Sequence, residues 1–325
     1  MSVFIIRRLM QSMAVIAVMG ALVFFGVNVV GDPVDMLINP EADQAEIDRV
    51  LHALGLDRPL HEQFWFFVTN ALKGDLGDSF IFGEPALQLI VQRIPATFEL
   101  ALAALFMAVI VGIPCGVYAG LKPEAKTSKA IMAGSILGFS LPTFWVGLMM
   151  IMVFAVMLGW LPSTGRGDTV PLGGIEVSFL TLDGLAHLLM PALNLALFKM
   201  SMVVRLARAG TREIVHQDYI KFARAKGVSE RRIIMVHLMK NILIPVVTVL
   251  GLEFGNLIAF SVVTETVFAW PGMGKLIIDA INNLDRPIIV AYLMITVVLF
   301  VTINLIVDII YSLLDPRVRL RDVKR

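Results

Sequence analysis

Long apolar stretches alternate along this chain with short segments rich in charged residues, glycine and proline. An α-helix needs about 20 mostly apolar residues to cross the hydrocarbon core of a bilayer, and Gly and Pro interrupt helices. The pattern therefore predicts an all-α integral membrane protein with six transmembrane helices. We expect the six spans at Leu9 to Val30, Leu100 to Leu121, Ile131 to Leu158, Leu188 to Val204, Ile242 to Phe268 and Ile288 to Leu314.

The composition agrees with this pattern. Hydrophobic residues make up 58% of the 325 residues and the mean hydropathy is +0.82, above what a soluble domain of this length normally carries. The lone cysteine, Cys115, lies inside an apolar span and has no disulfide partner within the chain. We expect Cys115 to serve packing alone.

Basic residues gather in alternate loops. Loops rich in Lys and Arg face the cytoplasm by the positive-inside rule, so we expect both termini there. The loop from Gly31 to about Glu99 is mainly acidic and is expected outside, with a short helix at Asp43 to Leu54 and an interfacial aromatic run at Phe64 to Phe67. The basic loops hold Arg7, Arg8, Lys122, Lys126, Lys129, the segment after the fourth span, and Arg317, Arg319, Arg321, Lys324 and Arg325.

These observations divide the chain into four parts. They are an N-terminal cytoplasmic end with the first helix (1–31), an extracytoplasmic loop region (32–99), a core of helices two to six (100–314) with a cytoplasmic segment at 205–241, and a cytoplasmic tail (315–325). A cleavable signal peptide is the competing interpretation of the first helix. Its apolar run of about 22 residues exceeds the 7–15 typical of a signal peptide, and no A-x-A site follows, which disfavours cleavage.

The segment from Arg205 to Asn241 is basic and amphipathic. Gly227 is suited to closing a helix in the left-handed conformation, and Ser229 to capping the next helix, with Glu230 in its first turn. This predicts helix, turn, helix. An apolar face on the first helix needs a protein or a membrane partner, and anionic lipid headgroups are the alternative to a protein. The expected apolar face is Ile214, Tyr219, Phe222 and Ala223, with Lys221, Arg224 and Lys226 in water.

Several short phrases also follow one another at characteristic spacing. They are Leu54-Gly-Leu-Asp-Arg-Pro-Leu60, Gly74-Asp-Leu-Gly77, Arg93-Ile-Pro-Ala-Thr-Phe-Glu-Leu-Ala-Leu102, Ser140-Leu-Pro-Thr-Phe-Trp-Val-Gly147, Leu161-Pro-Ser-Thr-Gly165, Gln217-Asp-Tyr-Ile220, Ala223-Arg-Ala-Lys-Gly227, Glu265-Thr-Val-Phe-Ala-Trp-Pro-Gly272 and Asp315-Pro-Arg317. With them, the chain resembles over nearly its whole length the inner-membrane permease subunits of bacterial ATP-binding-cassette importers for dipeptides and oligopeptides.

The resemblance implies a type I importer arrangement of six helices that translocates peptides by alternating access. It implies a multi-pass protein of the bacterial inner membrane, working with a second homologous permease, two ATP-binding cassette ATPase subunits and an extracytoplasmic substrate-binding protein. ATP and Mg are then held by the ATPases, and this chain binds no cofactor. Nickel chelates and glutathione are alternative solutes, because the same permease branch serves them.

The resemblance also places ATPase-coupling helices between helices four and five. The superfamily pattern there is Glu-Ala-Ala, three residues, then Gly, followed by a nearby Pro. This chain has Lys221-Phe222-Ala223 and Gly227, so only the second Ala and the Gly match, a departure typical of the peptide branch; Pro245 closes the segment. The expected coupling residues are Glu213, Gln217, Asp218, Tyr219, Phe222, Ala223, Ala225, Gly227 and Arg231.

Motifs for catalysis and metal binding are missing. The Gly274-Lys275 pair is followed by Leu276 and lacks the upstream Gly of a phosphate-binding P-loop. No Gly-x-Ser-x-Gly or paired intramembrane Asp motif suggests a protease. We expect a non-catalytic subunit with membrane lipid but no nucleic acid among its partners. No metal-ligand spacing links the histidines, which are His52, His61, His187, His216 and His237.

Ionisable residues inside spans are costly and point to function. Glu253 lies near the middle of the fifth span, and a partly polar stripe runs through it at helical spacing. This stripe is expected to face the translocation path or a partner helix. Two interpretations remain for Lys199 and Asp308. Either both side chains snorkel to the membrane surface, or Lys199 pairs with Glu253 or Asp308 and helps to set the inward-closed gate. The candidate path and gate residues are Lys199, Glu253, Asn256, Phe260, Thr264 and Asp308.

Glycines and prolines in the spans predict close helix packing and kinks. The glycines concerned are Gly112, Gly116, Gly120, Gly134, Gly138 and Gly147, and the prolines are Pro114, Pro142, Pro191 and Pro245. Two function classes remain as alternatives to an importer subunit. A stand-alone secondary transporter would need inverted repeats, which the sequence does not display. A membrane scaffold would tolerate apolar residues in the Glu253 stripe.

Overall fold

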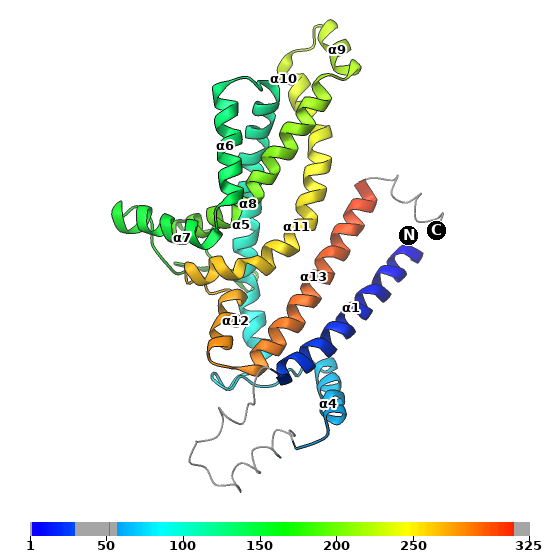
Figure 1. Cartoon of the computed structure of the whole chain (residues 1–325), viewed down its shortest axis with the longest axis vertical. Helices are drawn as coiled ribbons and strands as arrows, with labels where there is room; N and C mark the ends of the chain where they lie inside the picture. The colour runs from blue at the N-terminus through cyan, green and yellow to red at the C-terminus, as the bar shows by residue number, and fades with distance from the viewer. Residues whose placement is uncertain (1, 30–51, 53–56, 315–325) are drawn as a thin grey trace. The chain divides into compact units, whose positions relative to one another are not determined.

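The structure is a computed structural model that describes residues 2–29, 52 and 57–314. In these residues, helices dominate and the strands form a single short hairpin (Figure 1). Five helices are long and apolar enough to cross a membrane, and a bent pair of helices makes a sixth span if it is counted as one. The expected all-α membrane protein is therefore confirmed.

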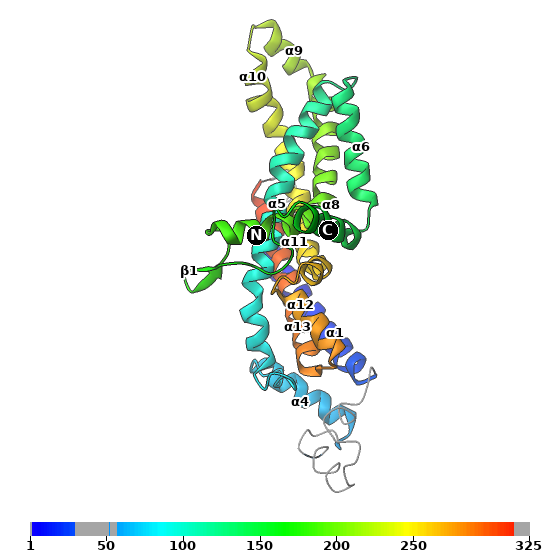
Figure 2. The ribbon, with the colours of Figure 1, turned by 90° about the vertical axis from the view of Figure 1, so that its left-hand side faces the viewer.

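The elements follow the predicted order with added detail. The long helices are α1 (Ser2–Val29), α5 (Ala86–Leu121), α8 (Leu182–Val215), α11 (Met239–Val267) and α13 (Arg286–Leu314). The shorter helices are α4 (Leu60–Leu72), α6 (Lys126–Ser140), α7 (Thr143–Met150), α9 (Asp218–Ala225), α10 (Glu230–Arg232) and α12 (Met273–Asn282), with π-helical η1 (Ile151–Met157) and η2 (Ile233–Leu238). Strands β1 (Val170–Leu172) and β2 (Ile175–Val177) pair antiparallel, and Figure 2 shows the hairpin projecting from its neighbours.

The chain forms two compact units. The first unit comprises Met1–Pro95 with Gly272–Leu305, and the second comprises Ala96–Pro271 with Ile306–Arg325. The four parts expected from the sequence differ in the side of the membrane on which they lie, which the two compact units do not report. That organisation stays a prediction. The tail at 315–325 and the expected helix at Asp43 to Leu54, His52 apart, lie outside the described residues.

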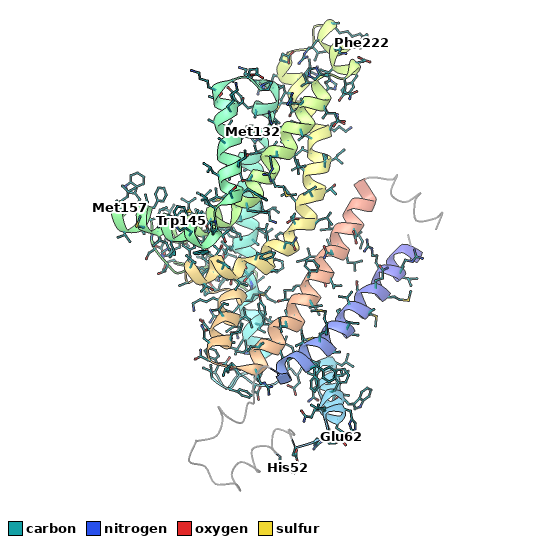
Figure 3. All side chains as sticks on the ribbon, viewed as in Figure 1. His52, Glu62, Met132, Trp145, Met157 and Phe222 are labelled. Carbon is teal, nitrogen blue, oxygen red and sulfur yellow. The ribbon has the colours of Figure 1, made fainter. Side chains whose placement is uncertain are left out.

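In the first unit, α4 packs on α1 through aromatic rings. Phe64 lies with its ring centroid 5.3 Å from Phe24 and 5.7 Å from Phe25, and Phe67 lies 5.5 Å from Phe24. Trp65 and Phe66 point away and are exposed. Figure 3 shows the side chains along α4, near the labelled Glu62. The aromatic run thus splits between packing on α1 and an outward face, the face suited to an interface.

The third expected span, Ile131 to Leu158, is wrong as a single helix. It breaks between α6 and α7, whose axes differ by 109°, and Figure 1 shows α7 lying across the line of α6. Pro142 is the physical cause. Proline pushes the residue before it out of the helical region, and Leu141 accordingly has φ −82 and ψ 138.

In the second unit, α5 and α8 pack closely along a row of small residues. A Cβ added at Gly112 would meet Val203 at 2.9 Å, and one at Gly116 would meet Ala207 at 2.6 Å. Gly120, Gly138 and Gly147 are also close to neighbours, whereas Gly134 has nothing within 4 Å. The expected close approach is confirmed at these five glycines and is wrong at Gly134.

Helix α8 is longer than the span expected at Leu188 to Val204. Its 34 residues correspond to about 51 Å at 1.5 Å per residue, well beyond a hydrocarbon core of about 30 Å. The first part of the basic segment, from Arg205 to Val215, therefore continues α8 without a break. In both views α9 and α10 extend beyond the loop that joins α5 to α6 (Figures 1 and 2).

Candidate functional site

The helix α9 ends at a glycine in the left-handed conformation, as expected. Gly227 has φ +75. Its N–H donates to the Arg224 carbonyl at 2.9 Å, and the Val228 N–H donates to the Ala223 carbonyl at 3.1 Å. These two bonds form a Schellman motif, which uses carbonyls that the helix end leaves without partners. The predicted helix, turn, helix is confirmed.

The start of α10 differs in its chemistry from the prediction. Ser229 occupies the N-cap position, but its side chain makes no capping hydrogen bond. Glu230 instead accepts from Arg224, with Nε to Oε1 at 2.7 Å and Nη2 to Oε2 at 3.3 Å. This hydrogen bond raises the pKa of Arg224 above its ordinary value. An ion pair, and not a serine cap, therefore joins the two short helices.

The aromatic residues of the expected apolar face of α9, Tyr219 and Phe222, lie on the outside of the helix. Ile220 is the fully buried residue of this helix, packed where α9 meets α8 and η2. Tyr219 is 46% exposed and Phe222 is 61% exposed, and Figure 3 labels Phe222 at the tip of the segment. The sequence predicted that this face meets a protein or a membrane, and the exposure of Tyr219 and Phe222 leaves both side chains available for such a partner. The side chain that is buried beneath α9 is that of Ile220, which the predicted face did not include.

The aromatic side chains on the exposed face of α9 each have one polar contact. Tyr219 accepts a hydrogen bond from Asn241 Nδ2 at 3.1 Å. Lys226 Nζ lies 4.6 Å from the centroid of the Phe222 ring. Most of the expected coupling residues are exposed, and Ala223 is partly buried. We call the exposed ones the α9 surface, which consists of Glu213, Gln217, Asp218, Tyr219, Phe222, Ala225, Gly227 and Arg231.

A charged pair joins α8 to α11 inside the second unit. Lys199 Nζ donates to Glu253 Oε2, and Asn256 Nδ2 donates to the same oxygen at 3.3 Å. The side chain of Lys199 is 8% exposed and that of Glu253 is 27% exposed. Snorkelling is therefore wrong for Lys199, and pairing with Glu253, one of the two acidic partners proposed for it, is confirmed, whereas the role of the pair at a gate stays a prediction. A buried charge without a partner would be much more costly.

The other expected path residues are not gathered in one place. Thr264 is buried and accepts from Asn194 Nδ2 of α8 at 3.2 Å, whereas Phe260 is 72% exposed. Asp308 is partly buried in α13. The polar stripe on α11 is thus partly or fully exposed from Glu253 to Phe260 and is buried at Thr264. Asn194 was missed because a single Asn within an apolar run gives no pattern.

The sequence also missed a buried carboxylate that binds two parts of the second unit. Glu99 Oε2 accepts from Arg166 Nε at 3.0 Å and from Nη2 at 2.5 Å. Its Oε1 accepts from the Ser178 N–H, the Ser178 hydroxyl and the Phe179 N–H at 2.7–2.9 Å. Arg166 also donates to the Glu176 carbonyl of β2 at 2.6 Å. Glu99 therefore ties α5 to the hairpin.

A second buried carboxylate lies on the same stretch of α5. Thr97 Oγ1 donates to Glu265 Oε1 at 2.8 Å, and Ser261 Oγ donates to the same atom at 2.9 Å. Trp270 Nε1 donates to the Ala96 carbonyl at 2.9 Å. We call these residues together the Glu99 cluster, consisting of Ala96, Thr97, Glu99, Arg166, Ser178, Ser261, Glu265 and Trp270. Two of the phrases quoted above, those ending at Leu102 and Gly272, meet here.

In the described part of the chain, no group of three or more His, Cys, Asp or Glu residues is arranged to hold a metal ion. What the geometry offers is an exposed helical surface, an intramembrane charge pair and a buried polar cluster.

Comparison with known proteins decides the family. Residues 112–320 match the family described as the binding-protein-dependent transport system inner membrane component, and residues 1–101 match the N-terminal model for the same membrane components. The chain belongs to this family. It is a multi-pass permease of the inner membrane and a non-catalytic subunit of a transport system that depends on a binding protein.

Two relatives cover the permease almost completely. The di/tripeptide transport system permease protein DppB of Pseudomonas aeruginosa is 38% identical over 320 residues, covering 91% of this chain and 95% of the relative. The glutathione transport system permease protein GsiC of Escherichia coli O6:H1 is 36% identical over 317 residues, covering 97% and 98%. The suspected peptide branch of importer permeases is therefore confirmed.

A solved structure supports the fold. A chain of the MetNI methionine ABC transporter, in an inward-facing form, aligns with a TM-score of 0.55 and 19% identity over 70% of this permease and 97% of that chain. At this identity the likeness concerns the fold. The ABC importer permease fold expected from the sequence is confirmed.

Proposed function

We propose that this permease passes dipeptides and oligopeptides across the inner membrane by alternating access. Its partners are a second homologous permease, two ATPase subunits and an extracytoplasmic binding protein. The ATPases hold ATP and Mg, and this chain binds no cofactor. The relatives support the solute class, since the printed names of DppB and GsiC specify di/tripeptides and glutathione, and glutathione is itself a tripeptide. Nickel chelates are the alternative solute.

The observation that carries the proposal is the α9 surface. Tyr219 and Phe222 are exposed, although Ile220 beside them is fully buried. Exposed aromatic residues beside cationic ones are typical of protein interfaces. Lys221, Arg224 and Lys226 supply the positive charge, so the positive-inside rule supports a cytoplasmic position for this surface. We assign it to docking of an ATPase subunit, with both termini on the same side of the membrane.

The connections of α9 support transmission of movement. It packs against α8 on one side and against η2 on the other, and η2 continues into α11. Lys199 lies 16 residues before the end of α8, about 24 Å along the helix. The Lys199–Glu253 pair then joins the two helices that α9 contacts. Displacement of α9 by ATP-driven closure of the ATPases therefore reaches both partners of this pair.

The test is co-purification of the tagged permease from a mild detergent, with its partner genes expressed. Phe222→Glu places a carboxylate on the exposed tip of α9 and leaves the buried Ile220 untouched. We expect the ATPase subunits to be lost while the second permease still co-purifies. Leu72→Glu is the matched control, since Leu72 is 83% exposed on α4 and lies in the other unit. This control should retain the ATPases.

Two outcomes would contradict the proposal. A native permease that purifies alone would favour a stand-alone secondary transporter, and the α9 surface would then be a lipid-binding surface. Capture of ATPases by a reconstituted complex that moves neither peptides nor nickel chelates would favour a scaffold. Uptake of labelled dipeptide into proteoliposomes, driven by ATP and the binding protein, separates these cases.

A further inference from the structure

The two oxygens of the Glu253 carboxylate have different surroundings. Oε2 accepts from both Lys199 and Asn256. Both hydrogen bonds that this carboxylate accepts from described residues therefore end on Oε2 and none on Oε1, and the side chain is 27% exposed. One oxygen of this carboxylate is therefore satisfied within the chain, and the other is open.

The position of Glu253 makes an open oxygen costly. It lies 14 residues from each end of α11, about 21 Å along the helix, and so at depth in a span. Lipid offers no hydrogen-bond donor there, and a carboxylate facing hydrocarbon is strongly disfavoured. Oε1 must therefore face a donor supplied by protein, by water in a path, or by a solute.

The same face of α11 continues with suitable chemistry. Asn256 is partly exposed, and Phe260 is 72% exposed one further turn along. From Glu253 to Phe260 the helix rises about 10.5 Å. An extended tripeptide spans about 10–11 Å. The carboxylate, the amide and the aromatic ring are thus spread over the length of the small peptides named for the relatives.

We propose that Oε1 of Glu253 binds the N-terminal ammonium group of the peptide during passage, with Asn256 and Phe260 alongside the backbone and side chains. The proposal rests on the proposed function and specifies how the path recognises its solute. An ammonium group has three donors, and hydrogen bonds between ionised groups are stronger than neutral ones.

Lys199 explains why such a site would release its solute. Its ammonium group already offsets the charge of Glu253 through Oε2, so the incoming ammonium meets a carboxylate that is half satisfied. Conduction needs binding weak enough for the solute to leave. Lys199 Nζ itself is buried at the pair and is not offered to the carboxyl terminus of the peptide.

The experiment measures protection of a cysteine by peptide. The complete transporter, without the binding protein, is placed in nanodiscs with Cys115→Ser and Phe260→Cys in this chain. Labelling by a charged thiol reagent is followed by mass spectrometry of this chain. Dialanine is compared with N-acetyl-dialanine, which lacks the ammonium group. At about three times its Kd, dialanine leaves roughly one site in four free, so labelling slows about fourfold.

Controls separate recognition from general occlusion. Thr266→Cys is exposed and about 20 Å further along α11 than Glu253, so dialanine should leave its labelling unchanged. Glu253→Gln should abolish protection at Phe260→Cys. Because this variant leaves Lys199 without its carboxylate, the Lys199→Met, Glu253→Gln double variant restores charge balance and should also lose protection. Glu176→Gln, at an exposed carboxylate, should keep it.

The inference is overturned if N-acetyl-dialanine protects as well as dialanine, if protection survives in the double variant, or if Phe260→Cys cannot be labelled in the native background. None of these results touches the capture of ATPases in the Phe222→Glu experiment. Loss of that capture from the native permease would instead defeat the proposed function.

Discussion

The α9 surface and the Glu99 cluster use their polar and aromatic residues in opposite ways. In the Glu99 cluster, every oxygen of the Glu99 carboxylate accepts hydrogen bonds from the same unit, and Trp270 is buried with its N–H donated to Ala96. On the α9 surface, Phe222 and Tyr219 are exposed. Both regions carry phrases on which the resemblance to peptide importers rests, but contacts within the chain bury the polar groups of the first region alone.

The difference in burial shows that polar and aromatic residues can be present either because the fold needs them or because a partner does. A buried carboxylate needs several donors, so Glu99, Arg166 and Ser178 are accounted for by folding alone. Tyr219 and Phe222 are exposed, so burial in the fold does not account for them, and under the proposed function they are covered by a docked partner. Stability measurements should therefore respond to the first region, and binding measurements to the second.

The largest effect on stability is expected from Glu99→Leu. It leaves Arg166, whose side chain is 13% exposed, buried without its carboxylate, and breaking a buried pair in this way costs about 3–5 kcal/mol. We expect a marked loss of monodisperse protein on heating in detergent, measured by fluorescence-detected size exclusion. Glu176→Leu, at an exposed carboxylate, should stay within about 0.5 kcal/mol of the native protein. Equal losses in the two variants would contradict a structural role for the cluster.

A smaller effect is expected from Gly227→Ala. The position has φ +75 and a Cβ would meet nothing within 4 Å, so the cost is backbone strain of about 1–2 kcal/mol. Gly83→Ala is matched, with φ +65 and open space around it. Both variants should lose similar stability in thermal unfolding. Only Gly227→Ala should weaken ATPase co-purification, and loss of ATPases in both would mean that the assay reports stability.

The smallest effect is expected from Arg224→Gln, which removes the ion pair between α9 and α10. Exposed pairs contribute little to global stability. We expect unchanged thermal unfolding, with faster amide hydrogen exchange confined to residues 218–232. Salt at 1 M, where the Debye length is about 3 Å, should produce the same increase in the native protein and none in the variant. Faster exchange throughout the unit would show that the pair supports more than the turn.

Local features were predictable from the sequence. The apolar runs set five of the six spans, because crossing a bilayer requires a fixed length of hydrocarbon-compatible helix. Gly227 was predictable as a left-handed residue because few other residues adopt that conformation easily. The break at Pro142 was foreseeable as a kink, but its 109° angle was not, since the angle depends on what α7 packs against.

Partners distant in the sequence were not predictable in the same way. Glu99 meets Arg166 and Ser178 across 67 and 79 positions, and no periodicity links residues so far apart. The alternatives left open for Lys199 illustrate the point. Its charge and depth were evident, but either Glu253 or Asp308 satisfied the argument, and only the packing of α8 on α11 selects Glu253.

The sequence by itself determined the membrane class, the approximate spans, the helix, turn, helix after α8 and, through its phrases, the family. These depend on residue type and on spacing within one helix. The tertiary structure alone decided which face of α9 is buried, which acid pairs with Lys199, and that Glu253 keeps one open oxygen. The physical reason is that burial and hydrogen bonding belong to pairs of surfaces, and a linear sequence does not state which surfaces meet.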